Sequence, residues 1–199
     1  RLNAIVFCLL FFGFFSVPAS AMGEVPSTRE ALTPTVEFNR EFGTAGGGDG
    51  QFYYPADVAL VGDVGSGSGN IFVADTGNNR VECLNSEGGF AYQFGGFGSQ
   101  PGRFNAPVGI VADFSSRLYV SERDNDRVQL LDILDTRGSF LRDVASGEVD
   151  YRALNDPAGM DVDYLGNLYI ADSGNDRIRK YNDDGTLLSV MGRFGYGPG

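Results

Sequence analysis

Short apolar runs alternate with clusters of Gly, Asn and Asp along the chain, and this pattern predicts strands joined by tight turns. Runs such as IFVA (71–74), RVECL (80–84) and FAYQF (90–94) are short and rich in Val, Phe and Tyr, as strands usually are. The segments between runs are too short for the crossover helices that parallel pairing requires. The strands are therefore expected to pair antiparallel.

One phrase recurs three times, at the end of the second strand of each group. It reads NIFVADTGNNRV from Asn70, RLYVSERDNDRV from Arg117 and NLYIADSGNDRI from Asn167. Within it an acidic residue precedes an arginine by five positions, and the pairs are Asp75 and Arg80, Glu122 and Arg127, and Asp172 and Arg177. The arginines stand 47 and 50 residues apart, and such a period indicates stacked supersecondary units.

Because the acid–arginine motif is present in every copy, we interpret it as part of what builds each copy rather than as a catalytic site. The Gly and Asn residues within it tolerate left-handed backbone, as a tight turn requires. The carboxylate is expected to accept backbone N–H groups of the residues that follow it, and the arginine to return to that carboxylate or to reach a neighbouring unit. The six residues are therefore predicted to be structural turn clips.

Each copy opens at a proline and contains four strand candidates. The copies extend over residues 55–95, 107–145 and 157–192. Four antiparallel strands per repeat, arranged radially, describe an all-β β-propeller, so three four-stranded blades are predicted. Residues 36–42 are expected to form a lone strand with no blade before it.

The recurring elements resemble the NHL repeat family over residues 36–199. They are P-x-[DG]-[VIM], [IL]-[FY]-[VI]-[AS]-[DE]-x-x-N-[ND]-R-[VI] and a glycine-rich F-G loop between copies. The third copy departs from this pattern, with Val144-Ala145 in place of Phe-Gly. The resemblance implies a propeller of about six blades, so the chain is expected to be a fragment of a longer protein.

Residues 1–21 resemble a secretory signal, because an uncharged apolar stretch at 4–17 precedes Pro18 and the sequence Ala-Ser-Ala. The alternative is a membrane anchor retained through residues 4–17, although this stretch is shorter than the roughly 20 residues of a span. Residues 22–35 are expected to be a linker to the propeller at 36–199. The protein is accordingly expected to be secreted or extracytoplasmic.

Charge and composition exclude several classes of function. The chain has 26 acidic and 15 basic residues, a net charge of −11, and such a surface repels nucleic acid and anionic lipid. Neither a nucleic-acid partner nor a membrane partner after signal removal is expected. Histidine is absent, and Cys83 is the one cysteine after the leader. Sites built on His or on several thiolates, and Ser-His or Cys-His catalysis, cannot be formed by these residues.

Calcium is the cation for which the sequence offers oxygen ligands. Candidates are Asp161 with Asp163, Asp183 with Asp184, and residues 124–126. None follows the spacing of a calcium loop, and a solvated face is the preferred interpretation. No metal, catalytic residue or cofactor is therefore predicted, and calcium is left open.

Two glycine-rich loops, residues 43–51 and 95–103, recur in register and are expected to connect blades at one rim, where propeller ligands often bind. Phe52 and Phe104, which also recur, are expected to fill space between blades. The possible ligand-facing residues of these loops are Tyr53, Tyr54, Phe97 and Arg103.

The sequence favours a non-catalytic function, that of an exported scaffold that binds a protein, peptide or glycan through its loops. The alternative is a propeller enzyme, a metal-dependent lyase or hydrolase with catalytic residues in further blades. The resemblance implies this enzyme alternative, because some NHL-like propellers are lyases with histidine at a metal centre and related propellers are calcium-dependent hydrolases. RNA binding, known for other NHL domains, is disfavoured by the negative charge.

Overall fold

The computed structural model describes residues 41–62, 68–134, 138–145 and 153–192, all within one unit of the chain. Over these residues the regular structure consists of strands and short 3-10 turns. The expected leader and linker, residues 1–35, lie outside the described residues. Among the residues that are described, no helix is long and apolar enough to cross a membrane.

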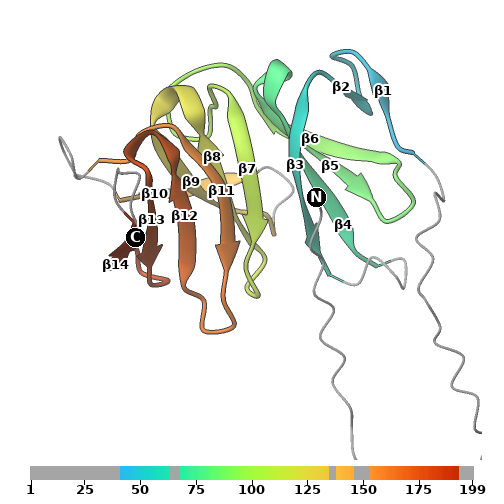
Figure 1. Ribbon diagram of the computed structural model, residues 1–199. Coiled ribbons are helices and arrows are strands. Elements are labelled where there is room, and N and C mark those ends of the chain that lie inside the picture. Colours follow the sequence, from blue (N-terminus) through green and yellow to red (C-terminus); the bar gives the residue numbers. More distant parts are fainter. Residues whose placement is uncertain (1–40, 63–67, 135–137, 146–152, 193–199) are drawn as a thin grey trace, which may run out of the picture. The chain divides into compact units, whose positions relative to one another are not determined.

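Each repeat unit forms one antiparallel sheet of four strands in chain order (Figure 1). The first sheet consists of β3 (Pro55–Val61), β4 (Asn70–Asp75), β5 (Arg80–Asn85) and β6 (Phe90–Gly95). The second consists of β7 (Pro107–Ala112), β8 (Arg117–Glu122), β9 (Arg127–Asp132) and β10 (Ser139–Val144). The third consists of β11 (Pro157–Val162), β12 (Leu168–Asp172), β13 (Arg177–Tyr181) and β14 (Leu187–Met191). These sheets are blades of a β-propeller, so the predicted fold class is confirmed.

The middle strands of the first two sheets are buried on both faces. In β4 the adjacent residues Phe72 and Val73 point to opposite faces of the sheet, and both are buried. A strand that is covered on both sides has a continuous apolar sequence rather than an alternating one. This explains why runs such as IFVA and LYV contain no charged residue.

Two hydrophobic clusters connect neighbouring sheets. Phe72 and Val81 of the first sheet belong to a cluster that includes Leu118 of the second. Tyr119 of the second sheet belongs to another cluster with Ile170 of the third. Full burial of one such side chain contributes roughly 1.5–3 kcal/mol, so packing between sheets is the main source of stability.

A change of strand register follows the proline that opens each sheet. Such bulges bend a strand and re-aim its side chains. Two residues after the proline, the first copy has Asp57, whereas the second and third have Gly109 and Gly159. Asp57 of the first sheet accepts a hydrogen bond from the backbone N–H of Ile110, at 3.0 Å. The corresponding Gly109 lies so close to the third sheet that an added Cβ would be 2.4 Å from the carbonyl oxygen of Ala158. This position therefore sets how the next sheet docks.

The loops that lead into the first two sheets contain a short parallel pairing. In the first loop β1 (Thr44–Ala45) pairs with β2 (Gln51–Phe52), and in the second Phe97 is bridged to Phe104. Of the lone strand expected at 36–42, residues 36–40 lie outside the described residues, and Glu41 and Phe42 are not in a strand.

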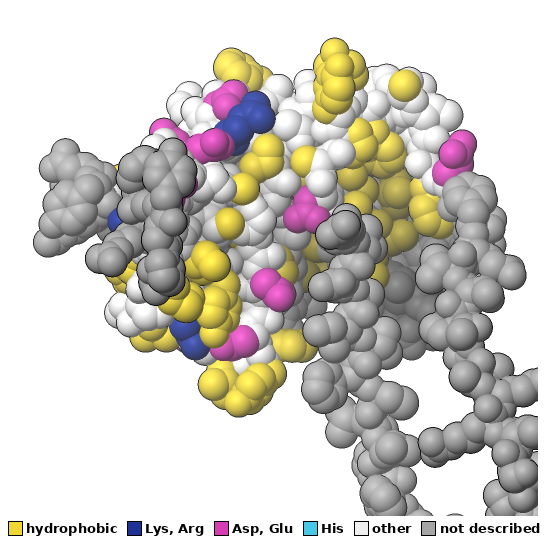
Figure 2. All heavy atoms as spheres, viewed as in Figure 1, with side chains coloured by type: hydrophobic (Ala, Val, Ile, Leu, Met, Phe, Trp, Pro, Cys, Tyr) yellow, Lys and Arg dark blue, Asp and Glu magenta, His cyan; other side chains and the backbone are white. Residues whose placement is uncertain are grey.

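Acidic side chains are scattered over the visible face of the molecule, whereas basic ones are few (Figure 2), in keeping with the net charge of −11. Apolar side chains gather at the tip of the β11–β12 hairpin, where Tyr164 and Leu165 are exposed. Each sheet has two ends with different kinds of connection. We name the end with the 3-10 turns and the loops into β3, β7 and β11 the loop edge, and the end with the β7–β8 and β11–β12 turns the hairpin edge.

Candidate functional site

The acidic residue of each motif binds the loop that precedes its own sheet. Its carboxylate is buried in all three copies and accepts a backbone N–H from that loop. The donors are Tyr53 to Asp75 at 2.7 Å, Asn105 to Glu122 at 2.9 Å and Asn155 to Asp172 at 2.8 Å. The expectation that the carboxylate accepts N–H groups of its own turn was wrong. The turn curls into a 3-10 conformation whose N–H groups point elsewhere, and the carboxylate makes no capping bond to it.

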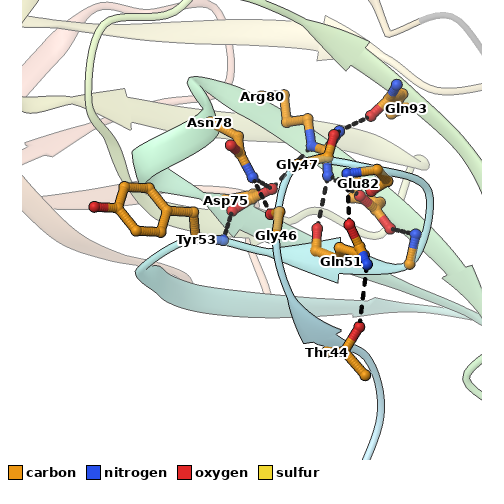
Figure 3. A network of polar contacts seen from close by, with 12 residues as sticks. Thr44, Gly46, Gly47, Gln51, Tyr53, Asp75, Asn78, Arg80, Glu82 and Gln93 are labelled. Atoms are coloured by element: carbon orange, nitrogen blue, oxygen red, sulfur yellow. Dashed lines mark hydrogen bonds and ion pairs between the residues drawn. The ribbon is translucent and has the colours of Figure 1, made fainter.

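The arginine of each motif binds both the carboxylate and the same loop. Its Nε lies 2.8 Å from Asp75 in the first copy, and 2.5 Å from Glu122 and from Asp172 in the others. The rest of the guanidinium donates to loop carbonyl groups. Arg80 binds those of Gly47, Gly48 and Gln51, Arg127 those of Ser99, Gln100 and Arg103, and Arg177 that of Ala153. Figure 3 shows Arg80 between Asp75 and the loop. The pair thus fastens a whole loop to its sheet.

An asparagine inside each turn completes this arrangement. Asn78 donates from Nδ2 to Asp75 at 2.8 Å and to the carbonyl oxygen of Gly46 at 2.9 Å. The equivalent residues Asn125 and Asn175 donate to the same two kinds of acceptor. The residue before the arginine has left-handed backbone in every copy, at Asn79, Asp126 and Asp176. The three motifs therefore share one geometry, although sequence alone did not show that the asparagine is part of it.

In the first two copies the residue two positions after the arginine also holds the loop. Glu82 accepts the N–H of Gly50 at 2.6 Å, and Gln129 accepts that of Gly102 at 2.8 Å. Glu82 also lies 2.7 Å from Arg80 through its second carboxylate oxygen. Burial raises the pKa of Glu82, against the opposing effects of the Gly50 N–H and of Arg80. Gln129 is neutral, so it accepts the N–H of Gly102 without the cost of removing a charged group from water.

We expect Glu82→Gln to make the fold more stable at neutral pH and to remove one component of its pH dependence. A carboxyl group whose pKa is raised on folding lowers stability as pH rises from its unfolded value, 4.5, through its folded value, because the folded state then binds more protons. The free energy of unfolding, measured by urea titration between pH 4 and pH 8, should fall less steeply with pH in the variant. An equal slope in the two proteins would contradict the assignment to Glu82.

The left-handed residues connect neighbouring sheets at the loop edge. Asn79 accepts through Oδ1 the N–H of Ala106 at 2.9 Å, and Asp126 accepts that of Asp156 at 2.8 Å. Ala106 and Asp156 occupy equivalent positions, directly before the proline of the next sheet, and both have positive φ. Each motif therefore fastens its own loop, and the first two also guide the entry of the following sheet.

The sequence-predicted loop residues lie at the loop edge but differ in exposure. Phe104 is fully buried in the cluster between the first two sheets, whereas Phe52 is half-buried. Tyr54 is 73% exposed, Tyr53 lies beside it with ring centroids 4.6 Å apart, and Phe97 is 75% exposed. Arg103 is exposed and donates to the carbonyl oxygen of Gly95 at 2.5 Å. Three exposed rings are thus presented at this edge.

A groove of about 590 Å³ opens at the loop edge between the first two sheets. Tyr54, Thr76 and Asn79 line it from the first sheet. Asn105, Arg123 and Asp124 line it from the second. Its volume lies within the roughly 300–1,000 Å³ that is usual for ligand sites. Of these residues the sequence predicted only Tyr54 as ligand-facing. The signal that could have revealed Arg123 and Asp124 is their departure from the Thr-Gly and Ser-Gly of the other copies.

The other candidates form no recognisable centre among the described residues. No group of three or more acidic or cysteine side chains there has a geometry that could hold a metal ion. The carboxylate of Asp163 accepts hydrogen bonds from the side-chain amide of Asn167, and these bonds lower the pKa of Asp163 to about 2. Asp161 belongs to β11, and Asp184 bonds Thr186 in a turn. Cys83 is fully buried, and burial raises the pKa of its thiol, as for a packed rather than a reactive cysteine.

Residues 154–181 match the family model of the NHL repeat, so the chain carries an NHL repeat there. Among curated proteins, Protein brain tumor of Drosophila melanogaster is 32% identical over 107 residues, 53% of this chain and 10% of that protein. The match thus spans about a tenth of its relative.

Similar solved structures share the fold. Hydrazine synthase of Kuenenia stuttgartiensis gives a TM-score of 0.54 at 17% identity, over 72% of this chain and 37% of that one. Virginiamycin B lyase of Staphylococcus aureus gives 0.50 at 15% identity, over 67% and 40%. At these identities the likeness concerns the fold alone.

Proposed function

Because the chain carries an NHL repeat and its sheets are propeller blades, we propose that it is part of an exported recognition scaffold that binds its ligand at the loop edge. The observation that carries the proposal is the 590 Å³ groove, which opens on the same edge as the exposed rings of Tyr54 and Phe97. Buried acid–arginine pairs hold the surrounding loops, so the contact surface is preorganised. A preorganised surface binds without a large ordering cost.

The chemistry of this edge supports binding better than catalysis. Arg123 pairs with Asp124 at 2.9 Å on an exposed turn. The carboxylates of the motif already accept hydrogen bonds from the N–H groups of their loops. A general acid or base needs a carboxyl group within reach of a substrate, often with a perturbed pKa. Asp75, Glu122 and Asp172 are buried behind the loops and cannot reach one.

The test is a comparison of two edges. The full chain is screened against immobilised glycans and displayed peptides, and binding of the strongest ligand is measured for Phe97→Ser and Phe114→Ser. Phe97 lies at the loop edge, and Phe114, 81% exposed, lies at the hairpin edge and is the matched control. We expect Phe97→Ser to weaken binding about tenfold, about 1.4 kcal/mol, with Phe114→Ser unchanged.

Two results would contradict the proposed function. One is a loss of binding in Phe114→Ser without an effect of Phe97→Ser, which would place the contact at the hairpin edge. The other is chemical conversion of the bound ligand, detected by mass spectrometry after incubation, which would make the protein an enzyme.

A further inference from the structure

The second copy departs from the repeat where the groove is lined. In the first and third copies, Gly77 and Gly174 donate their N–H to the carbonyl oxygens of Tyr53 and Asn155, at 2.7 and 2.9 Å. An added Cβ at Gly77 would lie 2.2 Å from the Tyr53 ring, so a side chain is not tolerated there. The second copy has Asp124 at this position.

The turn of the second copy consequently sits differently on its loop. Here Arg123, one position before the equivalent of Gly77, donates its N–H at 3.0 Å to the carbonyl oxygen of Ala106, one position after the equivalent of Tyr53. The clip itself is intact, because Glu122, Asn125 and Arg127 make the shared contacts. Arg123 and Asp124 are therefore not needed to build the sheet. Residues that depart from a structural repeat while exposed are available for binding.

The groove contains polar groups that the fold leaves unused. Among the described residues, the side-chain amide of Asn105 has no hydrogen-bond partner, and Asn79 uses only its Oδ1, on Ala106. Arg123 uses its Nε on Asp124, which leaves the two terminal nitrogens and one carboxylate oxygen for a ligand. Of these groups, the amide of Asn105 and the terminal nitrogens of Arg123 each present two adjacent hydrogen-bonding atoms in one plane. Such groups match vicinal hydroxyl groups in pairs.

An aromatic side chain stands beside these groups. Tyr54 lines the groove, is largely exposed, and is supported by Tyr53, whose ring is inclined at 58° to it. The face of an aromatic ring carries partial negative charge and attracts polarised C–H groups. The C–H face of a pyranose ring fits such a surface.

Shape and charge disfavour other ligands. Among the described residues, the groove is lined by small side chains at Ala56, Gly77 and Ala106, so it lacks a deep pocket for an anchoring side chain of a peptide. Besides the two 3-10 turns, Pro55 and Ala56 of β3 and Val108 of β7 line it, and Pro55 has no N–H to donate to an added peptide strand. The net charge of −11 disfavours anionic ligands.

We propose that this groove binds a neutral oligosaccharide, whose pyranose ring packs on Tyr54 and whose hydroxyl groups bond Asn79, Asn105, Arg123 and Asp124. This inference rests on the recognition function proposed above and assigns its ligand class. Arg123 and Asp124 supply specificity, because the other two copies do not have this pair.

The full chain is tested on an array that holds neutral, sialylated and sulfated oligosaccharides, together with a displayed peptide library. We expect binding to a neutral member, with saturation transfer in NMR concentrated on one face of a pyranose ring. Tyr54→Ala and the double variant Arg123→Thr/Asp124→Gly should each weaken it about tenfold or more, as loss of a stacked or paired contact does. Tyr54→Phe should retain most of the affinity.

The variants have matched controls. The double variant restores the Thr-Gly of the first copy, so its melting temperature should stay close to that of the parent. Tyr164→Ala removes a tyrosine that is 83% exposed at the hairpin edge, and binding should be unchanged. The inference is overturned if no neutral oligosaccharide binds, or if one binds equally well to the Tyr54→Ala and double variants. Peptide or anionic-glycan binding alone, lost in Phe97→Ser, would overturn the ligand class and leave the recognition function standing.

Discussion

Replacement of Arg80 by alanine is expected to destabilise the fold by about 3–5 kcal/mol, because it leaves buried carboxylates without their cation. Arg80 lies within 2.8 Å of Asp75 and 2.7 Å of Glu82, and both acids are fully buried. The same guanidinium donates to the carbonyl groups of the loop, which would lose their partners as well. The free energy of unfolding from urea or thermal denaturation measures the effect.

Arg123→Ala is the matched control for this experiment. Arg123 pairs with Asp124 at 2.9 Å, but both side chains are about half exposed, and such surface pairs contribute roughly 0–1 kcal/mol. If Arg80→Ala were no more destabilising than Arg123→Ala, the motif would not be a structural clip.

Gly109→Ala is expected to destabilise the fold by about 1–3 kcal/mol through overpacking between the second and third sheets. The added Cβ would lie 2.4 Å from the carbonyl oxygen of Ala158 and 2.6 Å from the hydroxyl of Ser121. That hydroxyl donates to the Ala158 carbonyl oxygen at 2.7 Å. The added methyl group would therefore clash with both atoms of this hydrogen bond. Thermal denaturation of the full chain measures the loss.

Gly159→Ala provides a control at the same repeat position. An added Cβ at Gly159 meets nothing within 4 Å. The substitution should therefore change stability by no more than about 0.5 kcal/mol. Equal losses of stability at Gly109 and Gly159 would show that the cost does not come from the contact of the second sheet with Ala158.

The fold is predicted well from the sequence because the pattern of each strand and turn occurs three times. Four short apolar runs per copy, a proline before the first and an acid–arginine pair between the second and third are enough to place the sheets. The bonding partners of the acid could not be predicted in the same way. The loop donor Tyr53 precedes Asp75 by 22 residues, and no local pattern connects the two.

The groove was the least predictable feature. Repetition identifies what the copies share, whereas the groove is lined by residues in which the second copy differs, Arg123 and Asp124. Exposure is likewise a property of packing: Phe97 and Phe104 stand in the same loop, yet one is 75% exposed and the other is buried. Sequence position alone gives no means to separate them.

Native-state hydrogen exchange of three backbone amides tests the central claim most directly, that each acid–arginine pair fastens the loop before its own sheet. The amides are those of Tyr53, Asn105 and Asn155, which donate to the buried carboxylates at 2.7, 2.9 and 2.8 Å. We predict protection comparable to that of the central strands in all three, with Arg80→Ala lowering it first at Tyr53. Exchange of these amides at the rate of exposed loop residues would contradict the account.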